Sequence, residues 1–222
     1  MLMTDGEMRD AMELGKLHIE NFSDRSLQPA SYDMRIGSRL LISSDDAEID
    51  LFQRSSAILK PGVFALVTTH EKVKLSDTIA GHIGVKSYYT RKGLVMLTGL
   101  QIDPGFEGVL VIGLYNASPR SLTLEYLAPF CTVEFHQLAR PVVKPFIPGS
   151  EQVEGYIPRA DKDYLRTLET KSLSEMSESL RELSVNVSTM SEAIKQMKWL
   201  MGGGFAFVSL VVAIIGLLSR MR

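Results

Sequence analysis

The stretch Gly99-Leu-Gln-Ile-Asp-Pro-Gly-Phe-Glu-Gly-Val-Leu-Val-Ile-Gly-Leu-Tyr-Asn116 decides the fold. Its Asp103-Pro104-Gly105 segment predicts a tight turn, because proline presets φ and glycine lets the backbone reverse. The apolar, β-branched run at residues 109–112 predicts a buried strand directly behind that turn. A carboxylate on a turn beside a rigid strand is held in a fixed direction. Asp103 is therefore either a cap of its own turn or a functional carboxylate.

The surrounding sequence predicts a mainly β domain. Thr4-Asp-Gly-Glu7 has the spacing of a capping box, which predicts a short helix at residues 5–14. Gly, Pro, Asn, Asp and Ser separate short apolar runs at intervals typical of a β-sandwich or barrel. Prolines at 141, 145 and 148 end the β region, so the predicted domain spans residues 1–148. The predicted strands are residues 17–20, 35–42, 62–69, 78–86, 94–98, 108–116, 122–125 and 131–138.

Composition limits the classes of function. The 222-residue chain is 45% hydrophobic and 23% charged, as globular proteins are, and its net charge of -2 argues against a nucleic-acid partner. Its single cysteine, Cys131, excludes an internal disulfide and alternates with Val133 and Phe135 along a predicted strand. We therefore expect a packed core thiol rather than a nucleophile.

The C-terminal third follows a different pattern. Residues 149–160 are predicted to be a linker. From residue 161 to 198 apolar residues alternate spacings of three and four, which favours a coiled-coil stalk over a single amphipathic helix lying on the domain. The seam comprises Leu173, Met176, Leu180, Leu183, Val187, Met190, Ile194 and Met197.

Residues 199–219 predict one transmembrane helix. The segment between Trp199 and Leu218 carries no charge and is about 20 residues long, enough to span a bilayer core. Trp199 and flanking Lys and Arg residues fit the two interfaces. A buried core helix is the alternative, but little else in the chain is left to cover it. The N-terminal residues show no signal peptide, so we expect the head to lie in the cytoplasm.

Three ordered motifs resemble the dCTP deaminase and dUTPase family, whose members are trimeric β-folds. They are residues 27–37, 84–94 and 102–108, and the likeness runs from Thr4 to Phe146. The resemblance implies a dUTPase-like β-barrel or sandwich (β-clip type) domain with a short N-terminal helix. It also implies a homotrimer with a deoxynucleoside triphosphate bound between subunits.

The resemblance assigns roles to particular residues. The aspartate at the position of Asp103 orients or deprotonates the water that attacks a phosphorus, and Mg²⁺ is held mainly by the phosphates. Lys86, Ser87 and Arg91 match phosphate-binding positions, and Gln101 is a further candidate for substrate binding. Phe106 lies either beneath the sugar, where it would select deoxyribose, or in the core. Asp33 and Arg35 are expected to form a structural ion pair.

Several departures from the family pattern are informative. Gly113 stands where dCTP deaminases carry the glutamate that moves protons, which argues against deamination. Tyr88 replaces the second serine of the phosphate motif. Gly155-Tyr-Ile-Pro-Arg159 is a poor match to a closing arm, and Arg159 either reaches a phosphate or is a solvated linker residue. We expect a membrane-anchored trimer that hydrolyses dUTP or a related dNTP, or an inactive nucleotide-sensing or scaffold module.

Overall fold

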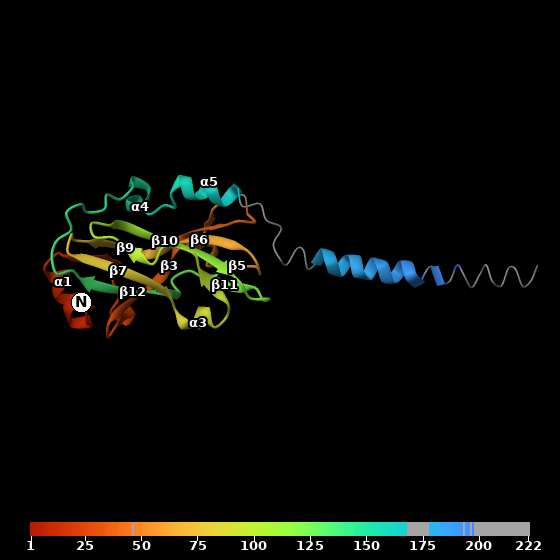
Figure 1. The fold of residues 1–222 in the computed structure, drawn as a ribbon, viewed down its shortest axis with the longest axis horizontal. Helices are drawn as coiled ribbons and strands as arrows, with labels where there is room; N and C mark the ends of the chain where they lie inside the picture. The colour runs from red at the N-terminus through yellow and green to blue at the C-terminus, as the bar shows by residue number, and fades with distance from the viewer. Residues whose placement is uncertain (46, 168–177, 193, 196, 198–222) are drawn as a thin grey trace, which may run out of the picture. The chain divides into compact units, whose positions relative to one another are not determined.

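The computed structural model describes residues 1–45, 47–167, 178–192, 194, 195 and 197. The chain divides into two units, Met1–Ser174 and Glu175–Arg222. The first unit is mainly β (Figure 1). Its elements are, in chain order, α1 (Asp5–Glu13), β1 (Leu17–Glu20), the 3-10 helix η1 (Asp24–Ser26), β2 (Leu27–Gln28), β3 (Ser31–Ile42), β4 (Ile49–Asp50), α2 (Leu51–Arg54), β5 (Ser56–Leu59), β6 (Phe64–Leu75), β7 (Ile79–Val85), α3 (Ser87–Thr90), β8 (Leu94–Met96), β9 (Gln101–Ile102), β10 (Glu107–Asn116), β11 (Leu122–Glu125), β12 (Pro129–Gln137), α4 (Ser150–Glu154) and α5 (Arg159–Thr167).

A curled antiparallel sheet with strand order β8-β10-β6-β3-β12-β7-β9 organises the unit, and β11 and β5 form a separate two-stranded sheet. The long strand β3 lies at its centre and changes partners along its length. Its N-terminal part, Tyr32–Arg35, pairs with β12, whereas Ile36–Ile42 pairs with β6. Register shifts mark both pairings near the point of change, and such irregularities bend a strand. The curl thus places β10 and β6 in one layer and β7 and β12 in the other.

Gly37 makes this change of partner possible. A Cβ atom built at residue 37 would lie 2.5 Å from the carbonyl oxygen of Thr69 and 2.7 Å from Thr68 Oγ1. Backbone atoms cannot yield at that distance, so β3 approaches β6 closely only because residue 37 lacks a side chain.

The core lies between the two layers of the sheet. Tyr32 and Met34 of β3 and Phe130, Val133 and Phe135 of β12 are fully buried in it. The predicted helix is confirmed as α1, and Thr4 and Glu7 form the reciprocal capping box. Its Met8 is fully buried and joins the same core.

The segment after β12 differs from the predicted linker. Residues 149–160 contain α4 and the beginning of α5, and Ile157 between these helices is fully buried. Lys162 Nζ lies 2.7 Å from Glu48 Oε2, and the Arg39 guanidinium stacks 5.1 Å from the centre of the Tyr156 ring. Apolar burial and these charged contacts hold the segment against the sheet. Figure 1 shows α4 and α5 on the side of the unit where β10 and β6 lie.

In the second unit, residues 178–192 are helical. The seam residues Leu180, Leu183, Val187 and Met190 are all exposed. The coiled coil stays a prediction, since seam residues Leu173 and Met176 lie outside the described residues. Among the residues that the structure places, no helix combines the length and apolar character needed to cross a membrane. The predicted span at 199–219 lies outside them.

Candidate functional site

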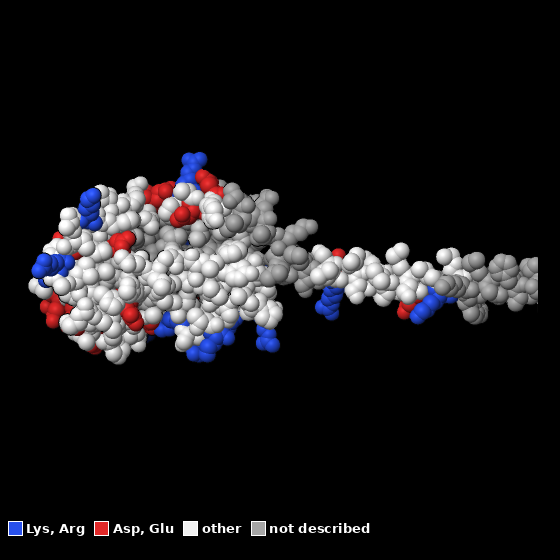
Figure 2. Space-filling view, in the orientation of Figure 1, with Lys and Arg blue, Asp and Glu red and all other residues white. Residues whose placement is uncertain are grey.

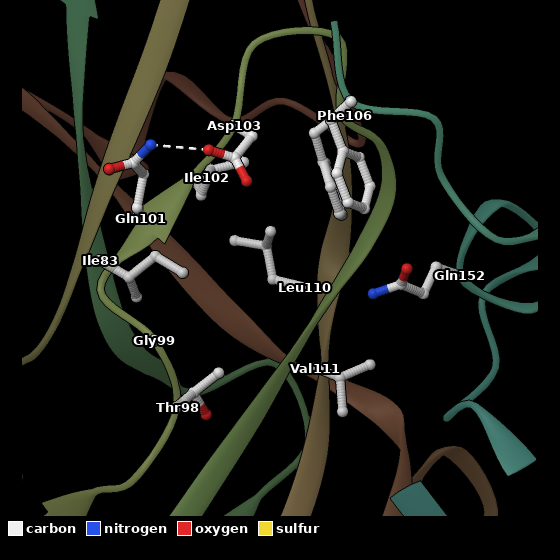
Figure 3. Close-up of a pocket in the computed structure, with 11 residues that line it drawn as sticks. Ile83, Thr98, Gly99, Gln101, Ile102, Asp103, Phe106, Leu110, Val111 and Gln152 are labelled. Carbon is white, nitrogen blue, oxygen red and sulfur yellow. Dashed lines mark hydrogen bonds between the residues drawn. The ribbon is translucent and has the colours of Figure 1, made fainter. Parts of the chain in front are cut away.

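Asp103 lies at the edge of a cavity of about 170 Å³ between β9 and β10 (Figure 3). Gln101 Nε2 donates a hydrogen bond of 2.6 Å to Asp103 Oδ1, as Figure 3 shows. Asp103 itself is exposed, so its second carboxylate oxygen is accessible to water or a ligand. Gln101 thereby fixes the direction of the carboxylate that the sequence singled out.

The turn that carries Asp103 closes through its backbone. Phe106 N–H donates to the Asp103 carbonyl oxygen at 3.1 Å. Gly105 has a φ of +91°, and a Cβ there would lie 2.7 Å from Pro145 Cβ and 2.8 Å from Phe146 O. Within the described part of the chain, the Asp103 carboxylate bonds to Gln101 and caps no backbone N–H of its own turn. The carboxylate is therefore not used to build the turn.

Phe106 combines the two positions that the sequence left open. Its side chain is only 7% exposed and belongs to the core cluster, yet it also lines the Asp103 cavity. The Phe146 ring stacks on it with centroids 5.9 Å apart. Phe146 is itself 39% exposed and comes from the segment after β12. The two rings form an aromatic wall that faces the cavity.

Gly113 faces a second, larger cavity of about 530 Å³. Its backbone N–H donates to Thr98 Oγ1, and Leu97 N–H donates to the Gly113 carbonyl oxygen at 2.9 Å. A Cβ at residue 113 would lie 3.2 Å from Thr98 Oγ1 and 3.7 Å from Leu66 Cδ2. The Thr98 hydroxyl thus lies close to the first atom of any side chain placed at residue 113. Position 113 offers no group that can carry a proton.

The predicted phosphate residues lie elsewhere in the chain. Ser87 begins α3, and Lys86 and Arg91 flank that helix. None of the three lines the Asp103 cavity. Lys86 instead borders another cavity, of about 510 Å³, together with Tyr88 and Lys92. Figure 2 shows Lys and Arg side chains gathered along the edge where α3 lies in Figure 1. One chain therefore does not bring the two halves of the predicted site together.

Tyr88 is held by a neighbouring cation. Lys92 Nζ donates a 2.5 Å hydrogen bond to the Tyr88 hydroxyl and also lies 3.8 Å from the centre of the tyrosine ring. The residue that replaces a serine of the motif thus presents a phenol paired with an ammonium group.

The predicted ion pair between Asp33 and Arg35 is wrong. Asp33 pairs with Lys86, whereas Arg35 Nε lies 2.6 Å from Oε1 of the fully buried Glu71. Arg35 also donates to the Asn21 carbonyl oxygen at 2.6 Å. Side chains two apart on one strand face the same way, but Glu71 on the neighbouring strand β6 and Lys86, which directly follows β7, provide the partners instead.

The sequence missed several residues that line the Asp103 cavity. Phe146 and Gln152 come from the segment that was predicted to end the domain and begin a linker, and no local pattern connects them to β10. Leu110 was contained in a predicted strand, but alternation alone does not tell which face borders a cavity.

A divalent cation at Asp103 would need ligands beyond the protein. Among the described residues, no three His, Cys, Asp or Glu side chains gather to hold a metal ion. Asp103 is the acidic residue that lines the smaller cavity. The donor set there fits a hard cation that takes most of its ligands from phosphate oxygens and water.

Comparison with known proteins identifies the family. Residues 2–138 match the family model "dCTP deaminase-like". A dCTP deaminase of Pyrococcus abyssi is 35% identical over 146 residues, which cover 66% of this chain and 90% of that protein. A "dCTP deaminase, dUMP-forming" of Persephonella marina is 29% identical and covers 66% of this chain and 89% of that protein.

A solved structure shares the fold. The crystal structure of 2′-deoxycytidine 5′-triphosphate deaminase from Agrobacterium tumefaciens matches with a TM-score of 0.50 and 22% identity. The match covers 60% of this chain and 46% of that one. The resemblance found in the sequence is confirmed, and the chain belongs to the dCTP deaminase-like family.

Proposed function

We propose that this protein binds a deoxynucleoside triphosphate and hydrolyses it, with dUTP or a related dNTP as substrate. The observation that carries the proposal is the Asp103 carboxylate, exposed at the edge of a cavity and oriented by Gln101 at 2.6 Å. An aspartate carboxylate can accept a proton from a water molecule that it holds in position.

The proposed reaction uses that carboxylate as a base. Asp103 accepts a proton from water while the water oxygen forms a bond to the α-phosphorus. The bond from that phosphorus to the bridging oxygen breaks, and pyrophosphate leaves with the nucleoside monophosphate as the other product. Mg²⁺ bound to the phosphates would neutralise charge on the leaving group. Phe106 would pack against the sugar.

Gly113 argues against deamination and is compatible with hydrolysis. Replacing a ring amine by water requires a group that moves protons beside the base. Position 113 has no side chain, and Thr98 Oγ1 already accepts its N–H. Attack of water on phosphorus does not need a group at this position. The relatives are named dCTP deaminases, and the family resemblance implies a glutamate at this position in such enzymes.

A homotrimer would complete the site. Lys86, Ser87 and Arg91 do not line the Asp103 cavity of their own chain. A second copy could place these residues beside the phosphates of a nucleotide held by Asp103 and Phe106. We further propose that residues 199–219 anchor the trimer in a membrane and that the head faces the cytoplasm.

One set of contacts favours a nucleotide sensor or scaffold instead. The Lys86 ammonium is already paired with Asp33, and the Lys92 ammonium with the Tyr88 hydroxyl. Neutralised cations attract phosphates less strongly. Such a protein would bind nucleotide, or keep only its trimer, without turnover.

Pyrophosphate release by the full chain in detergent tests the proposal, with dUTP and dCTP as substrates and Mg²⁺ present. Asp103→Asn keeps the size of the side chain but removes the base, so it should lower the rate by about 10²- to 10⁴-fold. Asp77→Asn, in the turn before β7, is the matched control and should keep the wild-type rate. Nucleotide binding by the wild type without pyrophosphate release would select the sensor.

A further inference from the structure

The Phe106 ring offers no free face to a ligand. The proposed function needs such a face, because it places the sugar of the nucleotide against Phe106. The Phe106 side chain is only 7% exposed and belongs to the core cluster. The Phe146 ring stacks on it, with centroids 5.9 Å apart and planes inclined by 26°. A sugar therefore cannot reach the Phe106 ring while Phe146 keeps this position.

The cavity beside Asp103 is too small for a nucleotide. Its volume is about 170 Å³, whereas pockets for small molecules usually measure roughly 300–1,000 Å³. Phe146 and Gln152, both from the segment after β12, line this cavity. Figure 3 shows Asp103 and Phe106 at the same end of it. Since Phe146 stacks on Phe106, its ring fills space that a ligand held by Asp103 would need.

The segment that carries Phe146 is held by few contacts. Residues 138–149 are all described and form no helix or strand. Phe146 N–H donates to the Pro104 carbonyl oxygen at 2.8 Å. Nearby side chains face solvent, since Val143 is 96% exposed and Ile147 is 87% exposed. A segment with so little buried apolar area opens at a low cost in free energy.

Both flanks of this segment are anchored, so it can lift without leaving the domain. On the N-terminal side, Val142 N–H donates to the Asp77 carbonyl oxygen at 2.9 Å. On the C-terminal side, the fully buried Ile157 holds the chain on the sheet. Residues 143–149 are therefore a loop between two fixed points, and loops of this kind can swing as lids.

We propose that Phe146 is an autoinhibitory plug, whose ring occupies the place of the sugar on Phe106 and must swing out before a nucleotide binds. The inference rests on the proposed function and adds a regulatory contact to it. Phe146 lies beyond residue 138, where the match to the family model ends. The plug therefore belongs to the part of the chain that follows the family domain.

The plug lowers the apparent affinity for nucleotide. When only a fraction of the protein is competent to bind, the apparent Kd rises by the inverse of that fraction. A stacked aromatic pair, with the apolar area that it covers, changes an equilibrium constant by roughly tenfold. Removing the Phe146 ring should therefore tighten nucleotide binding by about tenfold. If the ring instead contacted the nucleotide, its removal would weaken binding.

Calorimetry on the full chain in detergent tests the direction of this effect, using the α,β-imido analogue of dUTP with Mg²⁺. Phe146→Ala should bind the analogue about tenfold more tightly than the wild type does. Phe146→Leu keeps an apolar side chain but loses the stacked ring, so its affinity should lie between the two. Ile147→Ala, at the exposed neighbouring residue, is the matched control and should bind as the wild type does. Circular dichroism in urea checks that each variant is folded.

Hydrogen exchange of the wild type is a second test, which needs no substitution. In the plugged state the Phe146 amide is bonded to the Pro104 carbonyl oxygen. Saturation with the analogue should break this bond and speed exchange in residues 143–149, while exchange in the Asp103 turn slows. A loop that closes over the nucleotide would instead slow exchange in both places.

Each outcome separates the plug from the proposed function. Weaker or unchanged binding by Phe146→Ala, or slower exchange in residues 143–149, overturns the plug, and hydrolysis then stands or falls with pyrophosphate release by the wild type. Tighter binding by Phe146→Ala without pyrophosphate release from dUTP supports the plug and overturns hydrolysis. If neither the wild type nor Phe146→Ala binds the analogue, both proposals are wrong.

Discussion

The thiol of Cys131 lies in β12 with its side chain fully buried, as the alternation with Val133 and Phe135 predicted. Burial raises the pKa of this thiol well above its usual range, and the charges of Glu71 and Asp33 add to the effect. A raised pKa lowers the fraction of thiolate at every pH, and the thiolate is the reactive form. The core position thus excludes a nucleophilic role.

We expect Cys131 to be unreactive toward a disulfide reagent such as Ellman's reagent in the native protein at pH 8. The same assay in concentrated urea should titrate one thiol per chain, because unfolding removes the burial that suppresses the thiolate. Rapid reaction of the native protein would show that β12 opens readily or that the thiol is exposed.

Gly37 offers a second test at the level of one residue. Gly37→Ala places a Cβ 2.5 Å from the Thr69 carbonyl oxygen, so β3 and β6 must separate. The free energy of unfolding should fall by about 3 kcal/mol, as overpacking against a rigid neighbour does. Gly6→Ala in α1 is the control, since nothing lies within 4 Å of its added Cβ. It should raise stability by about 0.5–1 kcal/mol in urea unfolding.

The sequence predicted those residues of the candidate site that lie close together in one short motif. Asp103, Gln101 and Phe106 lie within six residues, and the structure places all three on one cavity. The Asp33–Arg35 pair failed because partners across a sheet depend on register, which the sequence pattern does not reveal. The better partners, Glu71 and Lys86, lie 36 and 53 residues further along the chain.

At the level of elements, strands with a regular apolar pattern were predicted best. β1 and β11 coincide with their predicted ranges, and β10 differs by one residue. β2, β4, β5 and β9 were missed: β2, β4 and β9 are two-residue strands, and the β5 segment carries little periodic signal. β3 was predicted from residue 35 but begins at Ser31, because pairing with β12 and β2 extends it. Tertiary pairing overrides local preference in such cases.

The helices α4 and α5 were difficult to predict, and a linker was predicted in their place. α4 has five residues with no side chain buried, so its sequence carries no amphipathic pattern. Its position follows from Gly108, where a Cβ would lie 2.6 Å from the Gln152 carbonyl oxygen. The close approach of two backbones is invisible in a pattern of polar and apolar residues.

The side chain of Ile157 anchors this segment on the sheet, and shortening that side chain tests its contribution. Ile157→Ala removes a fully buried side chain and should lower the free energy of unfolding by about 3 kcal/mol, measured by urea denaturation with circular dichroism. Ile147→Ala, at a residue that is 87% exposed, is the control and should change it by less than about 0.5 kcal/mol. Equal effects of the two changes would show that residues 149–160 do not pack on the sheet in solution.

At the scale of the whole molecule, two features call for further copies of the chain. The residues proposed to hold phosphate and the Asp103 cavity lie apart within one chain. In the second unit, Leu180, Leu183, Val187 and Met190 are each between 59% and 66% exposed. A regular apolar stripe on an otherwise polar helix is typical of a surface that packs against another helix.

Cysteine crosslinking of the full chain in detergent tests the threefold arrangement. If three heads assemble around one axis, their C-terminal segments start close together and at high effective concentration. Leu, Val and Ile at one core position, and Met with Leu183 at the other, do not by themselves fix the number of strands, so the head should decide it. Leu180→Cys and Val187→Cys should each crosslink to the same residue of another copy, because only parallel helices in register place identical residues opposite one another.

The native Cys131 is buried and should stay unmodified. Ser188→Cys, beside the seam, should crosslink less efficiently. The mass in detergent should correspond to three chains, which closed C3 symmetry requires. A mass of two chains, or Leu180→Cys that links only to a different seam position, would contradict the parallel trimer.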